Sequence, residues 1–208
     1  GIDNHSEVLA DFKKILGAEV FEIASLPPCV PGMRLNNKLV ATAKNERVDY
    51  VLGSKVTGCT VADGKVVSVT VGTAGAGKEI KADAVVLAGG GFESGALKLD
   101  SHGHLHETIL DLPVTMPEGV KEEDLIHGDY WGSPQPLFLC GVEVDETMLV
   151  TYQGKPVHSN VYAAGGVIAG ATRWQEKSGE GIALGSAIKA ADAILSSVGA
   201  GAATKERN

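Results

Sequence analysis

Two glycine-rich turns, each directly after a short apolar run, are the features of this sequence that could support ligand chemistry. The apolar runs are residues 82–88 and 161–164, and both are typical of buried strands. The glycines that follow them are Gly89, Gly90, Gly165 and Gly166. Glycine lets the backbone pass close to another group, and ligands of open α/β sheets lie beyond the carboxyl ends of the strands. We therefore expect the four glycines to line one cofactor crevice, although two ordinary strand-to-loop turns would show the same pattern.

A glycine-flanked helix start follows the second turn. Ser178, Gly179, Glu180 and Gly181 precede apolar residues at helical spacing, so we expect a helix from near Gly181 to about residue 198. The uncovered N–H groups of such a first turn can hold an anion, or the negatively charged N1/C2 carbonyl edge of a reduced flavin. A plain glycine-rich helix start is the alternative.

Two arginines are candidates for contacts to a phosphate or to a flavin. Arg34 lies in the proline-rich segment 26–35, which we expect to be irregular and to open onto a helix over residues 35–45. Arg173 lies in the loop that we expect over residues 171–177. For Arg34 the alternative is an ion pair with a local carboxylate. No residue is assigned as a catalytic acid or base.

Two further motifs are weaker. Residues 72–79 have the Gly-x-x-x-x-Gly-Lys spacing of a phosphate-binding loop, but Glu79 replaces the required hydroxyl and a strand is expected to follow, so a hairpin turn is the better interpretation. His102, His104 and His106 alternate beside Glu107 and could in principle bind zinc. An exposed loop is the favoured interpretation because Gly103 and the turn-like Asp100 interrupt the strand pattern.

The rest of the chain is typical of an α/β protein with α+β portions. We expect a helix over residues 4–16 that ends at Gly17, a short strand over 19–23, and an antiparallel meander whose first hairpin turns at Asp63-Gly64. Residues 108–158 are expected to be irregular, with short strands.

Composition excludes several classes of protein. The net charge of −8 disfavours nucleic acid or an anionic membrane surface as a partner. The three cysteines are far apart and indicate neither a disulfide framework nor a zinc site. We expect no apolar run long enough to cross a bilayer, and no signal peptide is apparent, so the expected location is the cytoplasm.

Taken together, these features make the chain resemble the B subunits of anaerobic glycerol-3-phosphate dehydrogenases, which are flavoproteins related to the wider family of FAD-dependent oxidoreductases. The segments that carry this resemblance cover most of the chain, and they are residues 26–28 with 31–35, 84–95, 134–136 with 141–145, and 160–166. The resemblance implies an FAD or FMN cofactor contacted by the second turn and by residues 178–181. It also implies oxidation of glycerol 3-phosphate to dihydroxyacetone phosphate, with electrons passed toward quinone.

The sequence departs from the family in having no β-α-β unit with Gly-x-Gly-x-x-Gly. We therefore expect a C-terminal fragment: the returning portion of a flavin-binding Rossmann-like domain (residues 1–16, 81–95 and 157–198), a substrate-side insert with the β-meander (17–80), and a β-rich connection (96–156). Such a fragment is expected to lack the cofactor and activity by itself, and to homodimerise through exposed edges.

The partners implied by the resemblance are the A subunit of glycerol-3-phosphate dehydrogenase and an iron–sulfur membrane subunit. They would place the protein at the inner face of the cell membrane without insertion. Two alternatives stay open: an assembly module that binds no cofactor, and another FAD-dependent reductase of the fumarate-reductase-like type.

Overall fold

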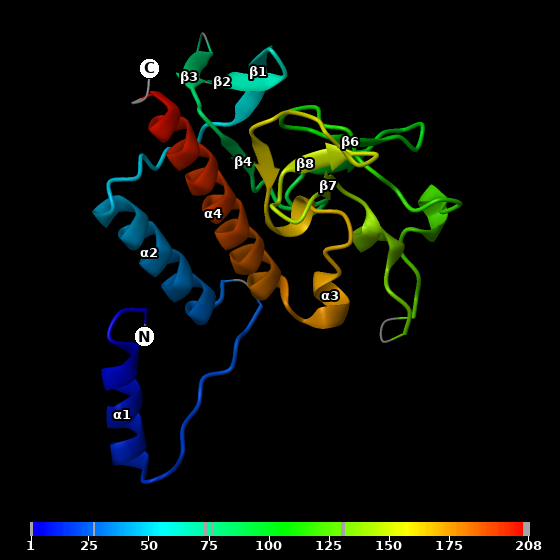
Figure 1. Ribbon diagram of the computed structural model, residues 1–208. Coiled ribbons are helices and arrows are strands. Elements are labelled where there is room, and N and C mark those ends of the chain that lie inside the picture. Colours follow the sequence, from blue (N-terminus) through cyan, green and yellow to red (C-terminus); the bar gives the residue numbers. More distant parts are fainter. Residues whose placement is uncertain (1, 27, 73–74, 76, 130–131, 206–208) are drawn as a thin grey trace. The chain divides into compact units, whose positions relative to one another are not determined.

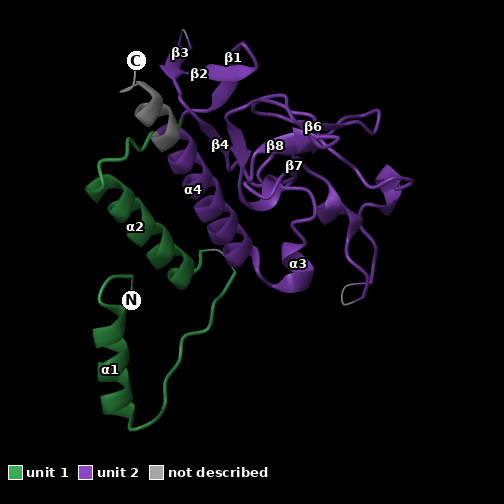
Figure 2. Ribbon diagram, viewed as in Figure 1, with its two compact units in different colours: residues 1–53 green, residues 54–208 purple. Residues whose placement is uncertain are grey.

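The computed structural model describes residues 2–26, 28–72, 75, 77–129 and 132–205, with side chains described as far as Val198. The chain forms two compact units, residues 1–53 and residues 54–208 (Figure 2). Helices and several small sheets are mixed along the chain (Figure 1), as expected for an α/β protein with α+β portions.

The first unit holds two amphipathic helices, α1 (His5–Leu16) and α2 (Val30–Asn45). Helix α1 ends as the sequence predicts, because Gly17 adopts the left-handed conformation and its N–H donates to the Lys13 carbonyl. The strand predicted over residues 19–23 is wrong, since this segment is irregular and has no strand beside it. The predicted start of α2 is also wrong: the helix begins at Val30, because Pro31 falls in its first turn, where a proline costs no hydrogen bond.

The second unit begins with the predicted meander, a sheet of β1 (Val56–Ala62), β2 (Lys65–Val71) and β3 (Lys78–Lys81) in that order. The turn residues Asp63 and Gly64 both have positive φ, as a two-residue hairpin of this hand requires. Because β3 is a strand and pairs antiparallel with β2, it takes the place of the helix that a phosphate-binding loop needs after Lys78.

Strands β4 (Val85–Leu87) and β10 (Val161–Ala163) form a parallel pair in which Val161 faces Val85. Asn160, directly before β10, ties this pair to the meander. Its side chain accepts the N–H of Val66 at 2.9 Å, and donates to the carbonyls of Val66 at 2.7 Å and Asp83 at 2.9 Å. Both glycine turns therefore leave the same edge of one small sheet, and the meander is fixed to that sheet.

The connection between β4 and β10 consists of short elements. Strand β5 (Leu97–Leu99) pairs with β6 (Leu105–Glu107), and β7 (Glu143–Val144), β8 (Val150–Tyr152) and β9 (Lys155–Pro156) form a second antiparallel sheet. The 3-10 turns are η1 (Glu122–Asp124), η2 (Pro136–Leu139) and η3 (Gly165–Val167). The core that these elements share is aliphatic and includes Val66, Leu87, Leu97, Val142, Val150, Val161 and Val167. The short strands β7, β8 and β9 agree with those predicted for residues 108–158.

One charged side chain is enclosed in this core. Glu107 is 2 % exposed, and its carboxylate accepts backbone N–H groups of Ile109, Leu110 and Leu112 at 2.6 to 3.2 Å. These bonds replace the water that the carboxylate loses on burial. Glu107 is thus a structural brace for the segment after β6.

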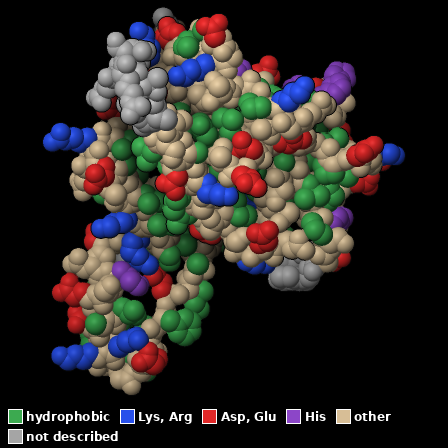
Figure 3. Space-filling model, viewed as in Figure 1, with side chains coloured by type: hydrophobic (Ala, Val, Ile, Leu, Met, Phe, Trp, Pro, Cys, Tyr) green, Lys and Arg blue, Asp and Glu red, His purple; other side chains and the backbone are tan. Residues whose placement is uncertain are grey.

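The chain ends in the short helix α3 (Arg173–Glu176) and the long helix α4 (Gly179–Lys205), which begins two residues earlier than predicted. Helix α4 is packed through small residues, Ser186 and Ala190, whereas Leu184, Ile188, Leu195 and Val198 are exposed. Figure 3 shows hydrophobic side chains at the surface of this region. The predicted tight packing of α4 is therefore limited to its small-residue face.

The stretch Gly179–Val198 of α4 is long and apolar enough to cross a membrane by length and composition, and 6 % of it is buried. The stretch is not the uninterrupted apolar run that the sequence analysis considered, because Glu180, Lys189 and Asp192 fall within it. The same criterion is met by helices of soluble proteins that pack on other protein surfaces, so it does not by itself define a membrane segment.

Candidate functional site

The ends of β4 and β10 bring the two predicted glycine turns together. The Ala164 N–H donates to the Leu87 carbonyl at 2.9 Å, which continues the strand pairing up to the turns. The Gly166 carbonyl oxygen lies 3.1 Å from the position that a Cβ atom on Gly91 would occupy. The first turn thus meets the second through Gly91, the residue after the two glycines that the sequence pattern indicates.

Gly89 and Gly90 are glycines because other side chains of the protein pack on them. A Cβ on Gly89 would lie 2.5 Å from Ile109 Cδ1, and one on Gly90 would lie 2.5 Å from Ser94 Oγ. The Ser94 hydroxyl also donates to the Gly89 carbonyl at 2.6 Å. Internal packing therefore accounts for both residues, whether or not a ligand approaches them.

Arg173 lies directly on the second turn. A Cβ on Gly166 would collide with its guanidinium group, and one on Gly91 would lie 3.1 Å from its Nη2. Arg173 donates to Glu93 Oε2 at 2.5 Å, and its Cζ lies 5.2 Å from the centre of the Phe138 ring. The side chain is 23 % exposed. A cation is therefore held between two glycine turns and an aromatic ring.

The N-terminal part of α4 is fixed to the same place. The Gly165 N–H donates to Ser186 Oγ at 2.9 Å, and that hydroxyl donates to the Ile182 carbonyl. The Ile182 N–H in turn donates to the Ser178 carbonyl at 2.8 Å, so Ser178 occupies the position before the helix and residues 179–181 form its first turn. The expectation that residues 178–181 all precede the helix is corrected accordingly.

Ser178 also orders the segment before α4. Its hydroxyl donates to Glu176 Oε2 at 2.8 Å, and Thr172 donates to the other oxygen of Glu176 at 2.9 Å. These two hydrogen bonds, that of Ser178 first, lower the pKa of Glu176. The carboxylate is thereby engaged locally and stays ionised.

Two hollows of about 380 and 350 Å³ adjoin these groups. The first is lined by Phe138, Arg173, Trp174, Lys177, Gly179 and Glu180. The second shares Phe138 and Trp174 and extends to His127, Gln135 and Leu137. The Lys177 Nζ lies 4.3 Å from the centre of the Trp174 ring. Cations, aromatic rings and a helix N-terminus meet here, and this set of groups fits a planar ligand with an anionic edge.

The family of the chain follows from comparison with known proteins. Residues 1–182 match the FAD binding domain family. The chain belongs to this family of FAD-binding domains. No solved structure matches the chain.

Relatives of this FAD-binding domain carry the name that the sequence resemblance suggests. The chain is 29 % identical over 203 residues to the B subunit of anaerobic glycerol-3-phosphate dehydrogenase from Actinobacillus pleuropneumoniae. The match covers 93 % of this chain and 45 % of the relative. The chain is also 29 % identical over 195 residues to the probable B subunit of the same enzyme from Halobacterium salinarum, covering 92 % and 44 %. The resemblance is therefore confirmed. The chain spans less than half the length of the curated relatives that it matches.

In this FAD-binding domain, Arg34 lies on α2 of the first unit and Arg173 on α3 of the second. Arg34 donates to Glu22 at 2.6 Å, and His5 lies 3.5 Å from the same oxygen. The hydrogen bond from Arg34 lowers the pKa of Glu22. The local ion pair named as the alternative is thus present, and a role for Arg34 in substrate binding stays a prediction.

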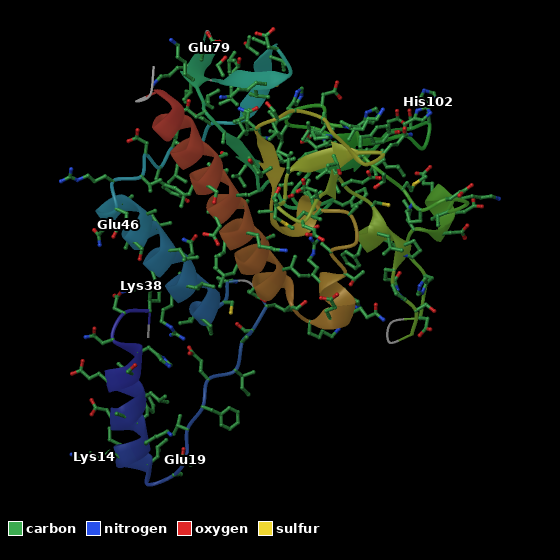
Figure 4. All side chains as sticks on the ribbon, in the orientation of Figure 1. Lys14, Glu19, Lys38, Glu46, Glu79 and His102 are labelled. Atoms are coloured by element: carbon green, nitrogen blue, oxygen red, sulfur yellow. The ribbon has the colours of Figure 1, made fainter. Side chains whose placement is uncertain are left out.

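The histidine cluster surrounds one carboxylate. Asp100 accepts backbone N–H groups of His102 and His104, and the imidazoles of His104 and His106 lie 3.4 and 3.1 Å from its Oδ2. Residues 100–104 form an exposed turn that carries His102 in Figure 4, as the favoured interpretation predicts, whereas His106 lies on β6. Within the described ranges, no group of three or more His, Cys, Asp or Glu residues is arranged to hold a metal ion.

Sequence reasoning missed Glu93, Phe138 and Ser186 as members of this site. Each lies far from Arg173 or Gly165 in sequence, and none was indicated as a site residue by a motif. The signal that could have found Ser186 is its position as a polar residue on the small-residue face of an otherwise apolar helix, because a buried hydroxyl needs a partner. No comparable signal exists for Glu93 or Phe138.

Proposed function

We propose that this FAD-binding domain is part of a flavin-dependent oxidoreductase that takes part in oxidising glycerol 3-phosphate to dihydroxyacetone phosphate. The observation that carries the proposal is the convergence of both glycine turns, Arg173 and the first two turns of α4 at one edge of the β4–β10 pair. Family membership supports flavin as the ligand, and the names of the relatives support the substrate.

In this proposal the chain supplies charge and shape around the cofactor. The first-turn N–H groups of α4 (residues 179–181) and the Arg173 guanidinium would face the negative edge of the ring or a phosphate. Phe138 and Trp174 would exclude water from it. The flavin, when bound, would accept the electrons of the oxidation. The relatives' designation as B subunits supports a second protein that contributes to substrate handling.

The wider arrangement is proposed on the same grounds. Residues 1–16, 81–95 and 157–198 would belong to the flavin-binding part, and residues 17–80 would face the substrate. The expected partners are the A subunit of the dehydrogenase and an iron–sulfur membrane subunit that receives electrons for quinone, which would place the protein in the cytoplasm at the membrane face. FAD is the favoured cofactor because of the family, and FMN is the alternative.

The test is a titration of the purified chain with FAD and with FMN, followed by quenching of flavin fluorescence. We expect this chain by itself to bind flavin weakly or not at all, and a longer version that includes a Gly-x-Gly-x-x-Gly unit to bind it saturably. In the form that binds, Arg173→Met should weaken the affinity about tenfold because a charge-assisted contact is lost. Arg47→Met, a matched change in the first unit, should leave the affinity unchanged. Failure of both flavins to bind this chain, and also a longer version that includes a Gly-x-Gly-x-x-Gly unit, would rule out the proposal.

A second candidate function is an assembly module that binds no cofactor. It is favoured by the exposed apolar side chains of α4, namely Leu184, Ile188, Leu195 and Val198. Such a surface is typical of a helix that packs against another protein surface. The flavin titration separates the two candidates, since a pure assembly module would bind neither FAD nor FMN.

A further inference from the structure

The Glu93–Arg173 ion pair occupies the place where the two glycine turns meet. Glu93 comes from the turn after β4, and Arg173 from α3, 80 residues further along the chain. Their hydrogen bond of 2.5 Å holds the guanidinium group over Gly91 and Gly166. The pair thus lies in the space that glycines keep open at the carboxyl ends of both strands.

Arg173 is well enclosed and Glu93 is not. The Arg173 side chain is 23 % exposed and rests on the Phe138 ring, whereas the Glu93 side chain is 62 % exposed. The arginine is therefore held in place by its neighbours, while the carboxylate can rotate into water at little cost. The glutamate is the member of the pair that can leave.

The charges around the hollow make Glu93 the group that neutralises Arg173. The acidic side chains of this region are Glu93, Glu176 and Glu180, and Glu176 is already engaged by Ser178 and Thr172. Glu180 lies in the first turn of α4, where a negative charge is favourable by itself. An anion that enters the hollow would compete with the Glu93 carboxylate for the guanidinium group, because the carboxylate engages its Nη2.

We propose that Glu93 is an internal competitor for the anionic group of the ligand. Its carboxylate holds Arg173 across the two glycine turns before a ligand binds, and an entering phosphate replaces it on the guanidinium group. The proposal rests on the proposed function for the source of that phosphate, which is either the flavin cofactor or glycerol 3-phosphate. Glu93 is then a residue that tunes affinity, and Arg173 is the residue that binds.

Removal of the competing charge should strengthen the binding of phosphate compounds. Partly exposed ion pairs change equilibrium constants by up to about fivefold, so Glu93→Gln should tighten binding about three- to five-fold. The gain should shrink at high salt, because screening weakens the competing pair as well as the new one. It should vanish in a protein that lacks Arg173.

The experiment is isothermal titration of the full chain with four ligands: inorganic pyrophosphate, glycerol 3-phosphate, FMN, and riboflavin, which lacks a phosphate. The variants are Glu93→Gln, Arg173→Met, the double variant, and Glu146→Gln as a control that removes the same charge from an exposed turn. Circular dichroism and the urea midpoint establish that each variant is folded. We expect tighter binding of the phosphate compounds, and not of riboflavin, in Glu93→Gln alone.

The outcomes separate the two proposals. If FMN binds and Glu93→Gln behaves like Glu146→Gln, or if the gain persists without Arg173, the competitor proposal is overturned and the flavin proposal stands. If neither flavin binds to any variant but pyrophosphate binds more tightly to Glu93→Gln, the competitor proposal stands, and the flavin proposal fails if the longer version with a Gly-x-Gly-x-x-Gly unit binds no flavin either. If no phosphate compound binds to any variant, the competitor proposal is overturned, and the flavin proposal falls with it if the longer version binds neither FAD nor FMN. A gain confined to FMN or to glycerol 3-phosphate identifies the source of the phosphate.

Discussion

The hydroxyl of Ser186 accepts a hydrogen bond from the Gly165 N–H at 2.9 Å and so joins the second glycine turn to helix α4. The same hydroxyl donates to the Ile182 carbonyl within the helix. Because both partners are main-chain groups, this one side chain connects the backbone of the turn to the backbone of the helix. The proposed site is therefore built on a contact between a turn and the second turn of a helix.

Replacement of Ser186 by alanine should destabilise the second unit by about 1–3 kcal/mol, because the buried Gly165 N–H loses its acceptor. Urea denaturation followed by circular dichroism measures the change. Ser196→Ala is the matched control, since that serine is exposed on the same helix and its hydroxyl donates to the Asp192 carbonyl of its own helix. Equal midpoints for the two variants would contradict the role assigned to Ser186.

Replacement of Asn160 by alanine should cost about 2–4 kcal/mol. Three hydrogen bonds are lost, and two of them satisfy the N–H and carbonyl of the fully buried Val66. Ser159→Ala, at the neighbouring exposed position, should change the unfolding free energy by less than about 0.5 kcal/mol. An Asn160→Ala variant as stable as Ser159→Ala would show that the meander does not depend on this link.

Replacement of Glu107 by glutamine should destabilise the protein by about 2–3 kcal/mol. In glutamine an NH₂ group replaces one carboxylate oxygen. This NH₂ group would face backbone N–H groups of residues 109–112, so two hydrogen-bond donors would meet without an acceptor. Glu118→Gln, at an exposed position, serves as the comparison in the same urea titration. The interpretation of Glu107 as a brace fails if the two variants unfold at the same urea concentration.

Replacement of Gly141 by alanine should cost about 2–4 kcal/mol, because the added methyl would collide with the Val167 carbonyl and the Ala169 nitrogen, which are backbone atoms that cannot rotate away. Gly154 also has positive φ, but nothing lies within 4 Å of its added Cβ. Gly154→Ala should therefore cost about 1–2 kcal/mol from backbone strain alone. Thermal melting of both variants tests this difference, and a smaller loss for Gly141→Ala would contradict it.

The Asp100 turn should contribute stability that depends on pH. The backbone N–H of His104 and the imidazole of His106 hold the pKa of Asp100 well below its usual range. A carboxyl group with a lowered pKa stabilises the folded state above its unfolded pKa of 3.8, and this contribution is lost as the pH falls further toward the folded value. The urea midpoint of Asp100→Asn should lie below that of the parent protein near pH 6, and the difference should shrink below about pH 4. A difference that stays constant over this range would exclude the linkage.

The features predicted correctly from sequence are those set by neighbouring residues. The Asp63-Gly64 hairpin, the end of α1 at Gly17 and the two strand–glycine turns each depend on local backbone preferences. The strand predicted over residues 19–23 is wrong because it depends on a distant feature. A strand needs a neighbouring strand to pair with, and the pattern of residues within 19–23 does not specify one. The sequence predicts too late a start for α2, because a proline is expected to interrupt a helix. Pro31 lies in the first turn of α2, where a proline costs no backbone hydrogen bond.

The candidate site was predictable only in part for the same reason. Gly165, Gly166 and Arg173 do lie together in the structure, and the glycines were found because they follow an apolar run. The partners that give Arg173 its position, Glu93 and Phe138, are separated from it by 80 and 35 residues. Contacts over such distances arise from the fold as a whole, and no local preference of either partner indicates them.

The link from Asn160 to Val66 also bears on the order in which the protein folds. The hairpin of β1 and β2 closes a two-residue loop, whereas the Asn160–Val66 contact closes a loop of 94 residues. Loops of that length cost more entropy and close more slowly than local hairpins. We expect the meander to form early and the parallel β4–β10 pair to assemble late. A newly made chain would then present an open sheet edge until β10 is available, and this interval is when misassembly with other chains would be most frequent.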